Sequence, residues 1–350
     1  MDSSRKSSSL VHTVETTPSE ASLGHEGRAR AIQPISYQER LRSKCRVEWQ
    51  AAVNLYAKLD KAEHRSRSWN LHECRTHAWF AQDLETNLVC VISNHCSLRW
   101  CPLCAQAKAN YIRRSVSDWL PRADHPKFLT MTLKHSKDPL SDQVTKLYES
   151  FQRLRDRKEF GELVTGGVWF FQLCRNTQRG EWHPHLHCII TGQYIPYQLL
   201  RKMWLEITGD SDVVDVRAVR DLEYVASEVA RYASRPAKLS DFGMKHQLEL
   251  YEAMHGKRLC GKWGHDTKVE LSVKRNRDLK RVLKVGSWEV VTQFANVDPR
   301  AKAILDAYEN QTPLAPGTSL QRLDDFIDDF HPWKPDELTV DLPPPEKTLF

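Results

Sequence analysis

The chain has 350 residues, of which 40% are hydrophobic and 27% are charged, and this composition is typical of a globular protein. No apolar run approaches the roughly 20 residues of a membrane helix, and the start "MDSSRKSSSL" lacks the apolar core of a secretory signal. We therefore expect a cytoplasmic protein with no membrane contact. The formal net charge is +6, and acidic residues dominate after Gln321, so the preceding body is strongly basic and suits a polyanionic partner.

The first third of the chain is predicted to combine a disordered start with a helical, cysteine-rich module. Residues 1–35 are rich in serine and poor in apolar anchors, which favours disorder. Apolar residues recur at helical spacing from Tyr37 to Leu59 and predict one long amphipathic helix. A segment containing Cys and His runs from His72 to Cys104, and a basic helix should follow it. We place this module at residues 36–120.

An alternation of strands and helices follows and sets the fold class. The pattern predicts strands at 127–133, 166–174, 183–192 and 212–219, and helices at 142–156, 197–207, 221–234, 240–256 and 298–309. The order βαββαβ plus a helix is the ferredoxin-like split βαβ arrangement of an α+β protein, with an antiparallel sheet covered by helices on one face. This core should span residues 121–265, followed by an extension at 266–320 and an acidic, Pro-rich tail at 321–350.

The stretch "EWHPHLHCII" places two histidines on one face of a strand. Side chains alternate along a strand, so His185 and His187 point the same way and could chelate one divalent ion through neutral imidazoles. If Arg179–Gly180 form a two-residue hairpin loop, Gln172 lies opposite His187 and Cys174 lies opposite His185. Gln172 could then supply an oxygen ligand. The alternative is a pair of core histidines bonded to the backbone.

The helix predicted at 221–234 carries Glu228 and Tyr232, which share one helical face because they are four residues apart. A tyrosine hydroxyl can attack a phosphodiester when a metal ion polarises the phosphate and a base assists proton removal. Taken alone, this pair also fits ordinary packing of a tyrosine. Tyr224, two turns earlier, is a candidate second nucleophile, although packing or stacking on DNA explains it as well.

Three motifs together resemble a known family. The strand "FLTMT", the pair in "WHPHLHCII" and the helix "EVARY" are similar to those of the HUH endonucleases, in particular the rolling-circle replication initiators of small plasmids. The resemblance covers roughly residues 70–265. It implies that Tyr232 is the nucleophile, that His185 and His187 hold Mg²⁺ or Mn²⁺, and that Glu228 activates water in termination. Gln172 stands where the family leads us to expect an acidic third ligand.

The resemblance implies a site- and strand-specific nickase and ligase. Its partner would be single-stranded DNA at a plasmid origin, and the protein would stay joined to the 5′ phosphate through tyrosine. The free 3′ hydroxyl would then prime synthesis. "GKRLCGKW" from Gly256 lacks the Ser or Thr of a phosphate-binding loop, so we expect a host helicase to unwind the DNA and a host polymerase to copy it. Alternatives are a two-tyrosine HUH transposase of an insertion element and a non-catalytic zinc-dependent DNA-binding protein. The sequence leaves the oligomeric state open.

The cysteines predict a second, structural metal site. "CSLRWCPLC" supplies Cys96, Cys101 and Cys104, and the last two have the spacing of a zinc knuckle. Our choice for the fourth Zn²⁺ ligand is Cys74, which lies upstream. The rivals are His77, Cys90 and His95, and a small core of reduced cysteines is the alternative to a metal site.

Overall fold

The computed structural model describes residues 35–176, 180–264, 267–272, 282–320 and 338–341, and the side chains of all of these except 230–233 and 338–341. The predicted disorder of the N-terminus lies outside the described residues, and so does most of the tail. The helices are α1 (Tyr37–Arg42), α2 (Arg46–Glu63), α3 (Arg67–His72), α4 (Pro102–Trp119), α5 (Leu140–Asp156), α6 (Lys158–Leu163), α7 (Tyr197–Thr208), α8 (Leu222–Ser234), α9 (Met244–Ala253), α11 (Trp288–Phe294) and α12 (Pro299–Asn310).

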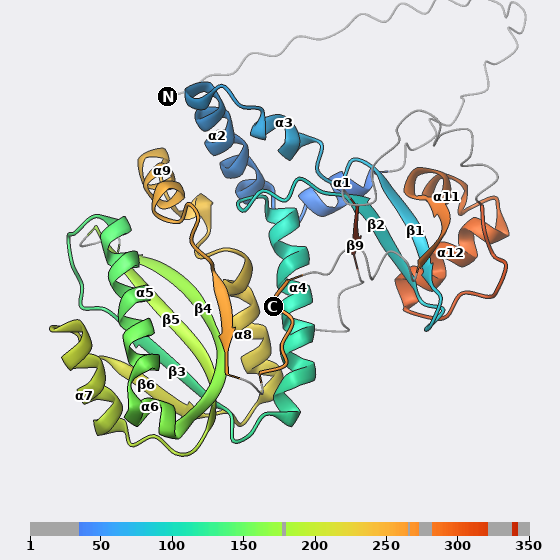
Figure 1. Cartoon of the computed structure of the whole chain (residues 1–350). Helices are drawn as coiled ribbons and strands as arrows, with labels where there is room; N and C mark the ends of the chain where they lie inside the picture. The colour runs from blue at the N-terminus through green and yellow to red at the C-terminus, as the bar shows by residue number, and fades with distance from the viewer. Residues whose placement is uncertain (1–34, 177–179, 265–266, 273–281, 321–337, 342–350) are drawn as a thin grey trace, which may run out of the picture. The chain divides into compact units, whose positions relative to one another are not determined.

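A five-stranded antiparallel sheet, in the order β6-β3-β5-β4-β7, forms the centre of the predicted core (Figure 1). Its strands are β3 (Lys127–Thr132), β4 (Val164–Asn176), β5 (Glu181–Gly192), β6 (Val214–Ala218) and β7 (Cys260–Trp263). Helices α5 and α6 connect β3 to β4, and α7 connects β5 to β6, which is the predicted βαββαβ succession. The predicted α+β class with an antiparallel sheet is confirmed.

Helices cover both faces of this sheet, so the expectation of one covered face is wrong. On one face Leu129, Met131 and Phe171 pack with the buried side of α5. On the other face Val168 and Phe170 pack with apolar residues of α4 and α8. The strands carry large apolar residues on both sides, and burying each such residue is worth about 1.5–3 kcal/mol, so neither face can stay in water.

A four-stranded antiparallel sheet has the order β8-β1-β2-β9, with β1 (Ala78–Asp83), β2 (Val89–Asn94), β8 (Val282–Ser287) and β9 (Leu338–Asp341). It therefore joins the cysteine-rich segment to residues far along the chain. Phe80 stacks on Trp288 of α11 with ring centroids 5.0 Å apart. Because every residue of β1 and β2 is buried, neither strand shows the alternation that reveals half-buried strands in a sequence. Strand β9 lies in the acidic, Pro-rich tail, for which no strand was predicted.

The long helix predicted from Tyr37 to Leu59 is divided into α1 and α2. Ser43 Oγ donates a hydrogen bond to the carbonyl of Arg40, and Cys45 Sγ donates to that of Leu41. Short polar side chains that bond to the nearby backbone compete with helix continuation, which explains the break. Apolar periodicity cannot reveal it, because both pieces bury the same stripe.

Candidate active site and metal centre

His185 and His187 lie on β5 and face the side of the sheet that α4 and α8 cover. Both imidazoles are half-buried, and their rings are nearly parallel with centroids 6.1 Å apart. Burial lowers the pKa of His185 to about 3, helped by the neighbouring imidazoles. Burial also lowers the pKa of His187 to about 4, although the carboxylate of Glu228 opposes this shift. Both rings are therefore neutral near pH 7, the state in which imidazole binds a metal ion.

The register of the hairpin differs from the predicted one by two residues. Gln172 pairs with His185, Cys174 pairs with His183, and Phe170 stands opposite His187. The prediction assumed a two-residue loop, whereas β4 ends at Asn176 and Gly180 donates its N–H to the Asn176 carbonyl at 2.8 Å. Gly180 adopts φ +71°, a left-handed conformation that glycine takes without a steric penalty. The longer turn moves every pairing along β4.

Gln172 nevertheless contacts His187, because it reaches the histidine diagonally across the strand pair. Its Oε1 lies 2.5 Å from His187 Nε2, and Thr130 Oγ1 lies 3.1 Å from His187 Nδ1. Both ring nitrogens thus have polar neighbours, and Phe128 stacks on the ring at 5.5 Å. The imidazole of His187 is held in one orientation, and an amide oxygen stands beside it.

The donor set fits a divalent cation. His185 Nδ1 is buried and makes no hydrogen bond within the described part of the chain, which is unusual for a polar atom in a protein interior. Together with this atom, an imidazole nitrogen of His187 and the side-chain oxygen of Gln172 form a mixed set of nitrogen and oxygen donors. Mn²⁺ and other divalent ions accept such a set. His185, His187 and Gln172 are the residues that would hold such an ion.

Helix α8 brings Glu228 to this face. Asp221 caps the helix by accepting a hydrogen bond from the Tyr224 N–H at 2.9 Å, and Val225, Ala226 and Val229 bury its apolar side. Glu228 is half-buried, and its effect on the pKa of His187 places its charge near that ring. The side chain of Tyr232 lies outside the described residues, but its backbone belongs to α8, one turn after Glu228.

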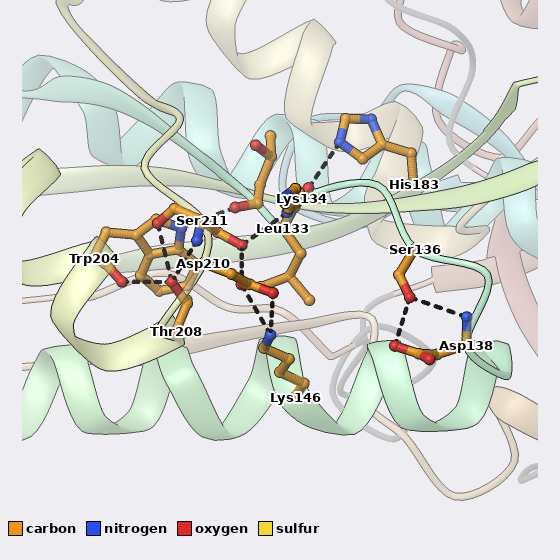
Figure 2. Close-up of polar contacts among 11 residues, drawn as sticks. Leu133, Lys134, Ser136, Asp138, Lys146, His183, Trp204, Thr208, Asp210 and Ser211 are labelled. Carbon is orange, nitrogen blue, oxygen red and sulfur yellow. Dashed lines mark hydrogen bonds and ion pairs between the residues drawn. The ribbon is translucent and has the colours of Figure 1, made fainter.

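Two further histidines, which the sequence analysis did not select, continue the row. His183 packs edge-on against His185 with ring centroids 4.1 Å apart, and His135 stacks on His183 at the same distance. His183 Nε2 bonds to the carbonyl of Leu133 at 3.1 Å, as Figure 2 shows. The available signal was the spacing of His183, since it is two residues before His185 and so shares its face.

The chain just after β3 is fixed by a polar network (Figure 2). Ser211 Oγ accepts a hydrogen bond from the Lys134 N–H at 2.8 Å and donates to Asp210, which Lys146 Nζ binds at 3.0 Å. Trp204 Nε1 donates to the Thr132 carbonyl at 2.8 Å. These bonds immobilise the segment that carries the Leu133 carbonyl and thereby support the histidine row.

The structure brings Cys74, Cys96, Cys101 and Cys104 together, with all four sulfur atoms within 4.8 Å of one another. The sulfur atoms lie 3.5 Å apart for Cys74 and Cys104, 3.7 Å for Cys96 and Cys104, and 3.7 Å for Cys74 and Cys101. Four sulfurs about 2.3 Å from a tetrahedral zinc ion would be about 3.8 Å apart. The cluster can therefore hold a metal ion such as Zn²⁺.

The rival ligands have other surroundings. His77 Nδ1 lies 3.0 Å from Thr76 Oγ1, and His95 Nδ1 lies 2.9 Å from Ser97 Oγ. Cys90 is buried among apolar residues of the small sheet, and its Sγ donates to the Ala81 carbonyl. Four thiols suffice for a closed structural site, so no rival is needed.

A buried arginine lies beside the thiol cluster. Arg75 is only 1% exposed, has φ +68°, and donates from Nη1 to Ser93 Oγ at 2.6 Å. Hydrogen bonds from the other thiols hold the pKa of Cys104 well below its usual range, and the Arg75 charge lowers it further. A guanidinium in this position favours thiolate over thiol, which is the form that binds metal.

Comparison with known proteins identifies the family. A family model described as "Replication protein" (Rep_1) matches residues 88–282, more than half of the chain. "Protein rep" of Staphylococcus aureus is 26% identical over 165 residues, which cover 43% of this chain and 72% of that protein. "Protein rep" of Streptococcus pneumoniae serotype 2 is 25% identical over 192 residues, covering 48% of this chain and 60% of that protein.

No solved structure matches the chain. The matched segment includes the histidine pair, the five-stranded sheet and three of the four clustered cysteines, with Cys74 upstream of it. The chain belongs to the Rep_1 family of replication proteins, and it is a plasmid replication initiator of that family. Within the described residues, no helix is both long and apolar enough to cross a bilayer.

Proposed function

We propose that this initiator starts rolling-circle replication by nicking one DNA strand at the plasmid origin and joining itself to the 5′ phosphate. The observation that carries the proposal is the meeting of the histidine pair and Glu228 on one sheet face, beneath the helix to which Tyr232 belongs. Similarity to two proteins named "Protein rep" supports a role in replication.

In the proposed reaction the hydroxyl oxygen of Tyr232 attacks the phosphorus of the scissile phosphodiester. A bond forms between this oxygen and phosphorus while the bond from phosphorus to the 3′ oxygen breaks, and the 3′ oxygen takes up a proton. When bound, Mg²⁺ or Mn²⁺ would polarise the phosphate oxygens and stabilise the charge that develops on them. Joining DNA to tyrosine conserves the phosphodiester linkage, so later rejoining requires no ATP.

Glu228 would act in the second half of the reaction. Its carboxylate would take a proton from a water molecule that attacks the phosphotyrosine, and the tyrosine oxygen would leave as Tyr232 is regenerated. His185 and His187 would stay neutral and keep the phosphate in place through the ion. A host helicase would open the duplex, and a host polymerase would extend the 3′ end.

The test is incubation of the purified protein with Mn²⁺ and a single-stranded origin oligonucleotide that carries a label 3′ of the nick. A covalent product should migrate with the protein on a denaturing gel. Tyr232→Phe removes only the hydroxyl oxygen and should form no product.

Tyr224→Phe is the matched control, because Tyr224 lies on the same helix and is 64% exposed. It should form the product as the unchanged protein does. An adduct from Tyr232→Phe that disappears in Tyr224→Phe would show that the wrong tyrosine was chosen. Loss of product in both single variants would indicate an enzyme that needs both tyrosines. Origin binding with no covalent product from the unchanged protein would favour a non-catalytic DNA-binding protein.

A further inference from the structure

The outer face of α2 carries a row of exposed side chains. Five residues at intervals of three or four share this face, and all are exposed: Val47, Gln50, Asn54, Lys58 and Lys61. The opposite face is buried through Trp49, Leu55 and Tyr56. The helix is thus packed on one side, and its outer row contributes nothing to the core.

Two side-chain amides at the centre of the row present a hydrogen-bond donor and an acceptor that match the edge of a DNA base. Gln50 Nε2 donates a hydrogen bond to Asn54 Oδ1 at 2.9 Å. This bond leaves the Gln50 oxygen as an acceptor and the Asn54 amino group as a donor, with no partner among the described residues. Adenine presents the matching acceptor and donor, N7 and N6, in the major groove of DNA.

The ends of the row add an apolar contact and two positive charges. Val47 is 73% exposed and could contact a thymine methyl group, while Lys58 and Lys61 form no ion pair within the described chain. The nearest acidic residue of α2, Asp60, is buried and lies 3.5 Å from Arg67. Glu63, the last residue of α2, is exposed, but it is paired with Arg65 and Arg67. The row itself is therefore cationic and carries no carboxylate of its own.

The dimensions agree with this chemistry. Helix α2 has 18 residues and so is about 27 Å long, and the major groove, about 12 Å wide, admits one α-helix. We propose that α2 binds double-stranded DNA, with Gln50 and Asn54 reading a base and Lys58 and Lys61 binding phosphates. The inference rests on the proposed function in that the duplex would be the origin beside the nick.

A buried carboxylate ties α2 to the catalytic helix. Glu48 Oε1, on the packed side of α2, lies 3.0 Å from Arg235 Nη1, and Arg235 is the C-cap residue directly after α8. It also accepts a hydrogen bond from the Leu239 N–H at 2.7 Å. A duplex held on α2 would thus have a fixed position relative to the end of α8, so the place of the nick would be set by where the duplex binds.

The experiment selects sequences from a random duplex library with the full chain, and then measures affinity for the enriched duplex by fluorescence anisotropy at several salt concentrations. The double variant Gln50→Ala/Asn54→Ala should bind the enriched duplex about 10-fold to 100-fold more weakly and lose the sequence preference. Lys58→Ala/Lys61→Ala should weaken all duplexes and reduce the slope of log affinity against log salt by about 0.9 for each lysine.

The control is Lys158→Ala/Lys202→Ala, which removes two exposed lysines from α6 and α7 and should leave affinity and slope unchanged. All three variants should keep the circular dichroism of the unchanged protein, since every altered residue is exposed. Cleavage of a single-stranded oligonucleotide should also persist, which separates this inference from the proposed nicking reaction. Enrichment of the same sequence with unchanged affinity and salt slope by both α2 variants would overturn the inference.

Discussion

The two candidate metal sites of this molecule differ in what surrounds each donor atom. In the cysteine cluster, four sulfurs lie within 4.8 Å of one another, close enough to surround one metal ion as a tetrahedron, and Arg75 lies buried beside them. At the histidine site the donors are mixed, one imidazole nitrogen has no hydrogen-bond partner among the described residues, and a carboxylate stands nearby. Closed sets of four ligands are typical of structural zinc, whereas catalytic ions keep positions for substrate. The comparison agrees with a structural role for the cysteine cluster and with the catalytic role that we propose for the histidine site.

The largest effect is expected at the closed site. Cys101→Ser removes a fully buried sulfur from the tetrahedron, and metal binding at such sites is coupled to folding. We expect loss of the single tightly bound zinc ion and a loss of several kcal/mol in the free energy of unfolding, out of a typical total of about 5–15 kcal/mol. Metal analysis and thermal unfolding measure both. Cys174→Ser, which alters an exposed cysteine, should change neither. If the Cys101→Ser protein contained no zinc and were fully stable, the cysteines would be ordinary core residues and not a structural metal site.

The histidine pair should behave in the opposite way. His185→Ala/His187→Ala should abolish cleavage of a single-stranded origin oligonucleotide, because the ion contributes several kcal/mol to charge stabilisation. Zinc content should not change, and duplex binding should stay largely intact because positioning contacts go mainly to phosphates. His125→Ala, at an exposed position, is the control. Full cleavage by the double variant would show that His185 and His187 do not hold the catalytic ion.

Glu228 tests whether the two halves of the reaction are separable. Glu228→Gln keeps the size of the side chain but removes the base, so the covalent product should form while its release slows about 100-fold or more. A time course of adduct formation and decay on a denaturing gel measures both steps. Glu223→Gln, exposed in the first turn of the same helix, should decay at the normal rate. Equal loss of formation and release would assign Glu228 to the first step.

The smallest effect is expected at Gln172. Gln172→Leu removes the oxygen that contacts His187, so affinity for Mn²⁺ should fall about 10-fold to 100-fold, and higher Mn²⁺ should restore cleavage. Titration of the cleavage rate with Mn²⁺ measures this change in affinity, and Gln193→Leu, at an exposed position, is the control. Gln172→Glu should raise the affinity for Mn²⁺, since a carboxylate binds the ion more strongly than an amide. Unchanged Mn²⁺ dependence in both variants would exclude Gln172 as a ligand.

The sequence predicted those features that depend on the spacing of residues within one short segment. The alternation of β5 predicted a shared face for His185 and His187. The spacing around Cys101 and Cys104 predicted a cysteine cluster with Cys74 as the preferred fourth ligand, and the structure brings these sulfurs together. The helix predicted at 221–234 is present as α8, and its apolar side lies on the histidine face. The roles of Tyr232 and Glu228 stay predictions.

The features that the sequence did not predict depend on contacts between segments that are distant along the chain. The hairpin register follows from a turn whose length no local pattern reveals, and it moved Gln172 from His187 to His185. The pairing of β1 with β8 joins residues about two hundred positions apart, and β1 is buried throughout and shows no alternation. Arg75 is buried although an arginine is rarely placed inside, and its contacts with Ser93 and with the thiol cluster come from segments that are distant in the sequence.

Helix α4 acts as a spacer of fixed length and fixed phase. It begins at the thiol cluster, where Cys101 Sγ accepts the Cys104 N–H, and its later turns pack Ile112, Val116 and Trp119 against α8. Deleting one residue between these regions would shorten the helix by 1.5 Å and rotate one end by about 100° relative to the other. Either the cysteines or the contact with α8 would then be lost. Relatives that keep both features should therefore tolerate substitutions along α4 far more readily than insertions or deletions.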